Sequence, residues 1–523
     1  MSTNLNRRQL IGAGLAGGLA LTSTATLPSL ADESSETDLF TLGVASGDPL
    51  PDSVVLWTRL CRSPLAPDGL GGMAARRYPV RWEVAEDDAF RRVVRRGSTV
   101  AAPSWAHSVH VEVDGLRPGR DYWFRFRAGR QLSPVGHTRT APGYDADPAA
   151  LAFAFTSCQN YPAGYFTALR HMAQDDLDVV LHLGDYIYEG GGGGALGRAH
   201  APASETFGLA DYRVRHSQYK TDPDLQALHA AHAMISVPDD HEVENNWAGD
   251  ISQVDTEPDQ DPAVFRQRRA AAFKAMYENM PYRRAQLPDG PDMRLYRRVR
   301  YGRLLDFSMI DTRQYRDDQL EDCVGDCEAR RDPGRTMLGE AQERWLVDGL
   351  ADPGAARWKV VGNQGISFEA DRVAGPGVAY SQDNWGGYAG ARQSLYDQVH
   401  EAGVENLVVV TGDAHRNASA ELKLDFADQS SPTIGTEFLG TSVSSGGDGG
   451  DQSALTRTWL AENPHIKFAN DQRGYQRVRV SRETLEVDYR VLEYVTRPGS
   501  PVSTRETMVV ESGRPGIVAG GRV

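Results

Sequence analysis

The chain has 523 residues, of which 40% are hydrophobic, and a formal net charge of -15 at pH 7. A chain of this length can bury two or three ordinary hydrophobic cores, so more than one domain is expected. The acidic balance excludes a protein that depends on a general affinity for nucleic-acid phosphates, because there is no surplus of lysine and arginine to displace counterions.

Residues 1–31 have the features of an export signal. Arg7 and Arg8 precede a short apolar stretch rich in glycine and alanine, and a small-residue pattern ending at Ala31 follows it. The segment resembles a twin-arginine signal. An uncleaved anchor is disfavoured because the apolar part is well short of the ~20 residues that span a bilayer. We expect the twin-arginine export machinery as a partner, no stable membrane span, and a mature protein that is secreted, periplasmic or associated with the cell wall.

Residues 38–142 are expected to form a small all-β domain. The stretches SVHVEV and YWFRFRA, which begin at Ser108 and Tyr122, alternate apolar and polar residues with the period of half-buried strands, and the turn sequence DGLRPG separates them. This pattern predicts a sandwich of the immunoglobulin or fibronectin III kind. A packing role is favoured for this domain over a role as a binding module.

Residues 150–510 alternate short apolar runs with helical stretches, which indicates an α/β domain whose strands are covered on both faces. Six of the apolar runs end in groups able to bind metals or anions. These groups are Cys158 to Asn160, Asp185 to Tyr188, Asp239 to Glu242, Asp311 to Arg313, Asn363 with Gln364, and Asp413 to Arg416. In layered α/β folds, sites are built at this edge of the sheet. A non-enzymatic surface-binding protein would leave these six strand ends unexplained.

Three of the strand ends carry carboxylates in suggestive positions. Asp185 follows a glycine that lets a ligand approach closely, and its carboxylate could bridge two metal ions. Without the other motifs, an aspartate at this position would be interpreted as part of a turn. In DDHE, which begins at Asp239, the adjacent carboxylates repel one another unless cations or hydrogen bonds organise them and the histidine. A solvated charged turn is the alternative. Asp413 and His415 are alternate residues and therefore share a face, with a spacing that suits neighbouring metals.

The four cysteines leave several pairings open. Cys323 and Cys327 flank a glycine and could close a small disulfide loop or remain two unpaired thiols. Cys61 and Cys158 could pair together or be separately free. A thiol hydrolase with Cys158 as nucleophile and His241 or His415 as base is disfavoured, because neighbouring carboxylates raise the pKa of a thiol.

Five motifs, in this order, resemble the PhoD family of alkaline phosphatases among the calcineurin-like metallophosphoesterases. They are GDYIYE, DDHEVENNWAG, DTRQYRDDQ, TMLGEAQERWL and VVVTGDAHRN. The resemblance covers essentially the whole mature chain. It implies an α/β fold in which a central β-sandwich flanked by helices, the metallophosphoesterase domain, follows the small all-β domain. It also implies an enzyme that hydrolyses small phosphate monoesters, and diesters as well, through a metal-activated hydroxide. A phosphodiesterase or phospholipase D-type enzyme on the same metals is the alternative, and nucleic acid is expected only as a possible substrate.

The resemblance also implies a set of site residues. Fe(III) would be held by Cys158, Asp185, Tyr188 and His415, and one or two Ca(II) ions by carboxylates that include Asp185, Asp240 and Asp413. Oxygen ligands suit both ions, whereas a thiolate is the odd member of the set. His241 and Asp185 are the expected catalytic residues, with His241 donating a hydrogen bond or proton to the leaving oxygen. Asn245 and Arg313 are further candidates for contacts to the phosphate. An iron site at Cys158 requires that this cysteine be unpaired.

Overall fold

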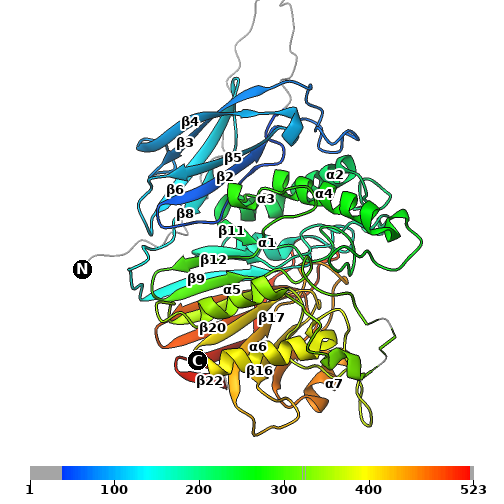
Figure 1. The fold of residues 1–523 in the computed structure, drawn as a ribbon. Coiled ribbons are helices and arrows are strands. Elements are labelled where there is room, and N and C mark those ends of the chain that lie inside the picture. Colours follow the sequence, from blue (N-terminus) through cyan, green and yellow to red (C-terminus); the bar gives the residue numbers. More distant parts are fainter. Residues whose placement is uncertain (1–37, 321, 324, 519–523) are drawn as a thin grey trace, which may run out of the picture. The chain divides into compact units, whose positions relative to one another are not determined.

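A computed structural model describes residues 38–518 of the chain, apart from 321 and 324 (Figure 1). The expected export signal, residues 1–31, lies outside the described residues. Within the described part, no helix has both the length and the apolar character needed to cross a membrane.

Two large sheets form the centre of the fold. The first sheet has ten strands, in the order β22 (Arg514–Val518), β21 (Val502–Glu511), β20 (Thr484–Leu492), β19 (Gly474–Ser481), β9 (Ala150–Thr156), β10 (Val179–His182), β11 (Ala233–Ser236), β1 (Val44–Gly47), β2 (Ser53–Arg59) and β5 (Ser108–Asp114). The second has seven, in the order β12 (Arg297–Tyr301), β13 (Leu305–Met309), β14 (Trp358–Asn363), β15 (Leu407–Thr411), β17 (Thr433–Leu439), β16 (Asn417–Lys423) and β18 (Ile466–Asn470).

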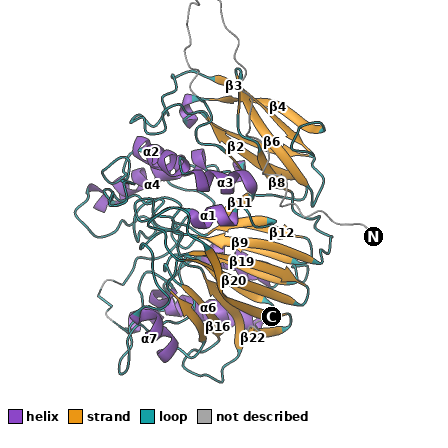
Figure 2. Ribbon diagram, turned by 180° about the vertical axis from the view of Figure 1, so that it is seen from behind, coloured by secondary structure: helices purple, strands orange, loops and turns teal. Residues whose placement is uncertain are grey.

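The six apolar runs predicted as strands are confirmed as β9, β10, β11, β13, β14 and β15. They belong to two sheets, three strands to each, and within each sheet the three are parallel. Parallel strands end at the same edge of a sheet, so the polar groups that follow them gather there. Strands β19 and β20 form an antiparallel pair (Figure 2).

The two sheets pack face to face, with helices on both outer faces. Phe153 and Leu181 of the first sheet meet Phe307 and Val408 of the second in one buried core. The neighbouring Val409 points the other way, into the core beneath the helices, as the alternation of side chains along a strand requires.

Helices α1 (Thr167–Met172), α2 (Leu209–Lys220), α3 (Pro223–Ala231) and α4 (Pro262–Asn279) share a core with the first sheet, and α5 (Glu340–Leu350), α6 (Ala389–Glu401) and α7 (Ala454–Glu462) with the second. The expected central β-sandwich flanked by helices is therefore confirmed.

The segment before residue 142 is all-β, as expected. A third sheet, in the order β4 (Val93–Ala101), β3 (Tyr78–Ala85), β6 (Asp121–Ala128) and β7 (Gln131–Leu132), with β8 (Gly136–Arg139) also paired to β6, packs on β2 and β5. Its partner layer is not a separate sheet, because β1 pairs in parallel with β11 and so joins this layer to the ten-stranded sheet. The domain limits 38–142 and 150–510 stay predictions.

The four cysteines form one disulfide and leave two buried thiols. Cys323 and Cys327 are bonded, with an S–S distance of 2.02 Å. Cys61 and Cys158 are both buried and unpaired. The requirement that Cys158 be free of a disulfide is thus confirmed.

Candidate metal centre

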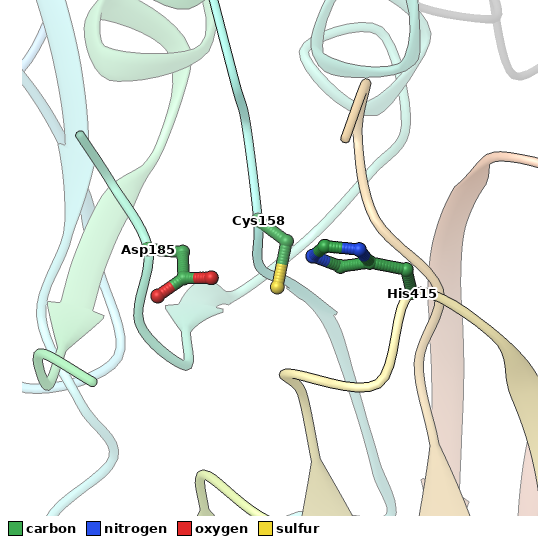
Figure 3. Close-up of side chains that lie close together, drawn as sticks. All are labelled: Cys158, Asp185 and His415. Atoms are coloured by element: carbon green, nitrogen blue, oxygen red, sulfur yellow. The ribbon is translucent and has the colours of Figure 1, made fainter. Parts of the chain in front are cut away.

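The ends of strands from both large sheets meet at one cluster of metal-binding groups. Cys158 follows β9, Asp185 follows β10, and His415 follows β15. One potential ligand atom from each residue lies within 4.8 Å of the others, and the three side chains point toward one another (Figure 3). Cys158 and Asp185 are buried, while His415 is partly buried. A thiol, a carboxylate and an imidazole that converge in this way form a candidate metal site.

A second group shares Asp185 with the first. Potential ligand atoms of Asp185, Asp240 and His241 also lie within 4.8 Å of one another. Asp185 is thus the one residue common to both groups in the described part of the chain, as a carboxylate that bridges two ions would be. The bridging role itself stays a prediction.

The backbone at these positions adopts a conformation that non-glycine residues rarely use. The φ angles are 59° at Cys158, 54° at Asp185, 65° at Asp413 and 56° at His415. A left-handed conformation costs a non-glycine residue on the order of 1 kcal/mol or more, and such residues concentrate at functional sites. The strain is offset by the surrounding packing, which holds the four side chains at the common edge of the sheets.

Two glycines permit the close approach of the strand ends. A Cβ atom on Gly184, whose φ is 109°, would lie 2.4 Å from the Cβ of Asp239. A Cβ atom on Gly412 would lie 2.7 Å from Oγ of Ser157, next to Cys158. Any side chain at either position would push apart the turns that carry the candidate ligands.

Several buried carboxylate oxygens at the site accept no hydrogen bond from the described residues. Asp185 Oδ1, Asp239 Oδ2 and Asp240 Oδ1 are buried and accept no hydrogen bond from any described residue. An unpaired buried oxygen of this kind is costly, because it has lost water without a replacement. The carboxylates therefore fit a site that binds cations, since a cation supplies the missing partner.

Tyr188 connects the ligand candidates of the first group. Its hydroxyl donates to Oδ2 of Asp185 at 2.8 Å, lies 3.1 Å from Nε2 of His415, and accepts from Oγ of Ser445 at 2.7 Å. Burial, and then the charges of Asp185 and Cys158, raise the pKa of Tyr188 well above its usual value. Burial and the charge of Asp185 likewise raise the pKa of Cys158. A thiol in these surroundings is a poor nucleophile unless a cation lowers its pKa.

His241 is held by a carboxylate that lies outside both groups. Its Nδ1 lies 2.7 Å from Oε2 of Glu189, and its ring centroid lies 4.1 Å from that of Tyr188. Burial alone would lower the pKa of His241, but the charges of Glu189, Asp240 and Asp185 raise it well above its usual value. With Nδ1 engaged, Nε2 is the ring nitrogen left for a substrate or a metal.

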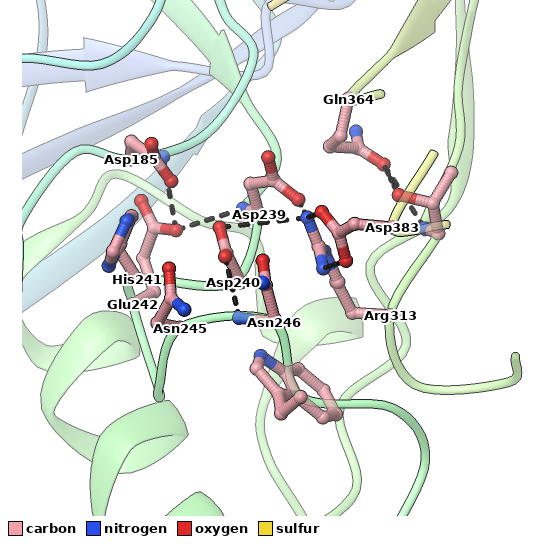
Figure 4. A network of polar contacts seen from close by, with 12 residues as sticks. Asp185, Asp239, Asp240, His241, Glu242, Asn245, Asn246, Arg313, Gln364 and Asp383 are labelled. Atoms are coloured by element: carbon pink, nitrogen blue, oxygen red, sulfur yellow. Dashed lines mark hydrogen bonds and ion pairs between the residues drawn. The ribbon is translucent and has the colours of Figure 1, made fainter. Parts of the chain in front are cut away.

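Arg313 is at the centre of an ion-pair network on the far side of Asp240 (Figure 4). Its Nε donates to Asp239 at 2.5 Å, and its two terminal nitrogens donate to the two oxygens of Asp383 at 2.7 and 3.0 Å. Arg313 Nη2 also lies 3.7 Å from Asp240. Burial raises the pKa of Asp240, but the charges of Arg313 and His241 outweigh burial and bring it below its usual value. Arg313 thus orients carboxylates of the site, and its expected contact with phosphate stays a prediction.

Glu242 fixes the backbone of two of the turns. Its carboxylate accepts hydrogen bonds from the backbone N–H groups of Asp185, Tyr186 and Asp239, at 3.2, 2.5 and 2.8 Å. Burial raises the pKa of Glu242 to about 8 even though these donors act to lower it. This residue ties the turn that carries Asp185 to the turn that carries Asp240.

The remaining predicted residues lie at the border of the site. Asp413 belongs to neither group, although burial and then the charges of Asp239 and Asp383 raise its pKa well above its usual value. The backbone N–H of Asn245 donates to Oε1 of Glu189 at 2.8 Å, and its amide nitrogen donates to Gln253. Asn245 therefore supports Glu189 through its backbone, and its contact with phosphate is untested.

Sequence reasoning missed three supporting residues. Glu189 ends the motif GDYIYE and Glu242 ends DDHE, so both could have been found as further carboxylates within the motifs. Asp383 lies in a loop with no motif around it, and the sequence offered no signal for its pairing with Arg313.

The chain is similar in sequence to known phosphatases. Residues 153–489 match the PhoD-like phosphatase family, and residues 24–142 match the N-terminal domain of PhoD-like phosphatases. The chain is 45% identical over 529 residues to alkaline phosphatase D of Bacillus subtilis (strain 168), an alignment that covers 99% of this chain and 89% of that protein.

Two solved structures of phosphatases are also similar to the chain. One described as the structure of PhoD shares 46% identity, with a TM-score of 0.89 over 94% of each chain. A purple acid phosphatase from yellow lupin (Lupinus luteus) seeds shares 12% identity, with a TM-score of 0.53 over 90% of this chain and 73% of that one, which is a likeness of fold.

Proposed function

The chain belongs to the PhoD-like phosphatase family, and from that premise we propose how its metal centre hydrolyses phosphate esters. The family and the relative from Bacillus make it an enzyme, an alkaline phosphatase that acts as a phosphoesterase. The identity of the metals, the roles of the residues, the class of ester and the route of export are proposals. The observation that carries them is the carboxylate of Asp185, which is common to two groups of candidate ligands.

Cys158, Asp185, Tyr188 and His415 would hold Fe(III), and Asp185, Asp240 and Asp413 would contribute to one or two Ca(II) sites. The donor set supports this assignment, because phenolate and carboxylate oxygens suit Fe(III) and carboxylates suit Ca(II). The unpaired oxygens on Asp185 and Asp240 support it as well. When bound, such ions lower the pKa of a water molecule and neutralise charge on the phosphate oxygens.

The protein's own residues orient the substrate and supply a proton. His241, whose Nδ1 is engaged by Glu189, would present Nε2–H to the leaving oxygen of the ester. The charges of Glu189, Asp240 and Asp185 raise the pKa of His241 well above its usual value, which favours the protonated form that a donor requires. Arg313 holds Asp239 in place and neutralises part of the negative charge beside Asp240.

Phosphate monoesters are the proposed substrates, with diesters hydrolysed at the same site. A preference for diesters, as in a phosphodiesterase or a phospholipase D-type enzyme, is the alternative, and it depends on the room around the second ester group. We also propose that the chain is exported through the twin-arginine machinery, on the basis of residues 1–31 alone.

The experiment compares the wild-type enzyme with Asp185→Asn, each supplied with iron and calcium. Asparagine keeps the shape of the side chain but removes the charge that two cations would share, so hydrolysis of an aryl phosphate monoester should be abolished while the fold is retained. Circular dichroism checks the fold, and an aryl diester assayed in parallel gives the ester preference. Full activity in Asp185→Asn, or in wild-type enzyme stripped of metal, would refute the proposal.

A further inference from the structure

A cavity of about 140 Å³ borders the metal centre and has no part in the proposed mechanism. Asp413 and Arg416, from the turn after β15, line one side of it. The loop that carries Asp383 lines another, through Ser381 and Asn384. Because Asp383 holds Arg313 at the site, one loop contacts both the ion-pair network and the cavity. Among the predicted metal ligands, the cavity is therefore lined by Asp413.

The lining combines an apolar part with a cationic part. Ile366, Phe368, Leu455 and Trp459 give an apolar surface, in which the rings of Phe368 and Trp459 lie 6.2 Å apart and nearly perpendicular. Arg372 and Arg416 also line the cavity. Its only acidic lining residue is Asp413, a candidate metal ligand.

One cationic side chain on the cavity has no partner in the described part of the chain. Arg416 donates to the carbonyl of Ala414 and lies 2.9 Å from Asp471, whereas the exposed guanidinium of Arg372 makes no hydrogen bond or ion pair to any described residue. The available chemistry suits an apolar group that carries an anion.

We propose that this cavity, which we call the alcohol subsite, binds the alcohol portion of the phosphate ester and selects alcohols with an apolar body and an anionic group. The inference rests on the proposed function. A phosphate bound beside Asp413 has one group attached to it that can extend past Asp413 into the cavity, and this group is the esterified alcohol. The apolar wall packs on its body, and Arg372 pairs with its anion.

The test compares two esters that differ only in this anion. Full-length enzyme loaded with iron and calcium is assayed on phenyl phosphate and on para-carboxyphenyl phosphate. The wild-type enzyme should prefer the carboxylated ester by about 5- to 20-fold in kcat/KM, which is the value of one partly exposed charge-assisted hydrogen bond. In Arg372→Gln the preference should fall below about twofold, through a higher KM for the carboxylated ester, because a uniform binding contact is lost.

The matched control is Arg457→Gln, an exposed arginine on α7 that does not line the cavity, and it should keep the wild-type preference. Equal kcat/KM for the two esters, or a preference that survives Arg372→Gln, would overturn the subsite and leave the phosphoesterase proposal standing. Failure of the loaded enzyme to hydrolyse either ester would overturn both.

Discussion

Glu189 shows how a residue outside the ligand groups controls one within them. Its carboxylate accepts from the backbone of Asn245 and pairs with Nδ1 of His241, so it fixes both the position and the charge of the imidazole. Burial acts to raise the pKa of Glu189, but the charge of His241 prevails and lowers it. Each charge of the pair therefore favours the ionised form of the other.

Glu189→Gln should move the alkaline limb of the kcat–pH profile to lower pH. The amide oxygen of glutamine can still accept from Nδ1 of His241, although the backbone N–H of Asn245 loses its acceptor. The substitution removes the charge that raises the pKa of His241, so the imidazole loses its proton at a lower pH. A shift of about 1 to 2 pH units is expected for the loss of one adjacent charge. The measurement is kcat on an aryl phosphate from neutral to alkaline pH.

The matched control is Glu340→Gln, which alters an exposed glutamate that pairs with Arg344 far from the site in sequence. Its profile should match that of the wild-type enzyme. An unchanged alkaline limb in Glu189→Gln would show that His241 is not the proton donor.

Individual site residues could be predicted from the sequence where a motif contains several side chains able to bind metals. Cys158, Asp185, Asp240 and His415 were predicted as ligands. The structure brings Cys158 and His415 into the first group, Asp240 into the second and Asp185 into both. Asp383 could not be predicted, because one aspartate in a loop has no local feature that reveals an arginine distant in the sequence. Such pairings depend on how the loops fold over the sheet edge.

At the scale of the elements, the turn after β10 depends on close contact with the turn after β11. Gly184→Ala should lower the free energy of unfolding by about 1 to 3 kcal/mol, because the added Cβ would overlap Asp239 and the backbone is left-handed there. The same displacement should reduce metal content, since Asp185 is the next residue. Urea unfolding and metal analysis measure the two effects.

Gly190→Ala is the control for this substitution. A Cβ at Gly190 would have no atom within 4 Å, and its φ lies outside the left-handed region. Stability and metal content should therefore stay close to those of the wild-type protein. Equal effects of the two substitutions would contradict the close-contact argument.

The strands could be predicted from the sequence where burial alone determines which residues are apolar. Runs such as the one around Val408 are apolar on both faces because they lie between a second sheet and a layer of helices. The pairing of β1 with β11 was not predictable, because periodicity reports which side chains are buried and not which strand lies beside them. The division of the six strands between two sheets could not be predicted from the sequence for the same reason.

At the scale of the whole molecule, Lys220 connects folding stability to pH. It is buried, its Nζ donates to the hydroxyl of Tyr186 at 3.0 Å and lies 4.4 Å from the ring of Trp57, and it forms no ion pair with any described carboxylate. Burial, and then the charge of Arg59, lower its pKa from 10.5 to about 7. Between these values the unfolded chain binds a proton that the folded chain lacks, so stability rises with pH in this window.

Lys220→Met should remove this dependence. The wild-type protein should gain about 3 kcal/mol of unfolding free energy relative to the variant between about pH 7 and pH 9.5, as an order of magnitude. Chemical unfolding at the two pH values measures the difference. Lys467→Met, at a partly exposed lysine, should behave as the wild-type protein does. Parallel stability curves for wild type and Lys220→Met would contradict the argument.

The central claim is that Cys158, Asp185, Tyr188 and His415 hold iron, and the most direct measurement is metal analysis of the purified protein together with its visible absorption spectrum. The account predicts iron in the protein and a visible charge-transfer band from the phenolate and the thiolate. The band should be lost in Tyr188→Phe or strongly changed in Cys158→Ser. A colourless zinc protein that hydrolyses phosphate esters would contradict the iron site.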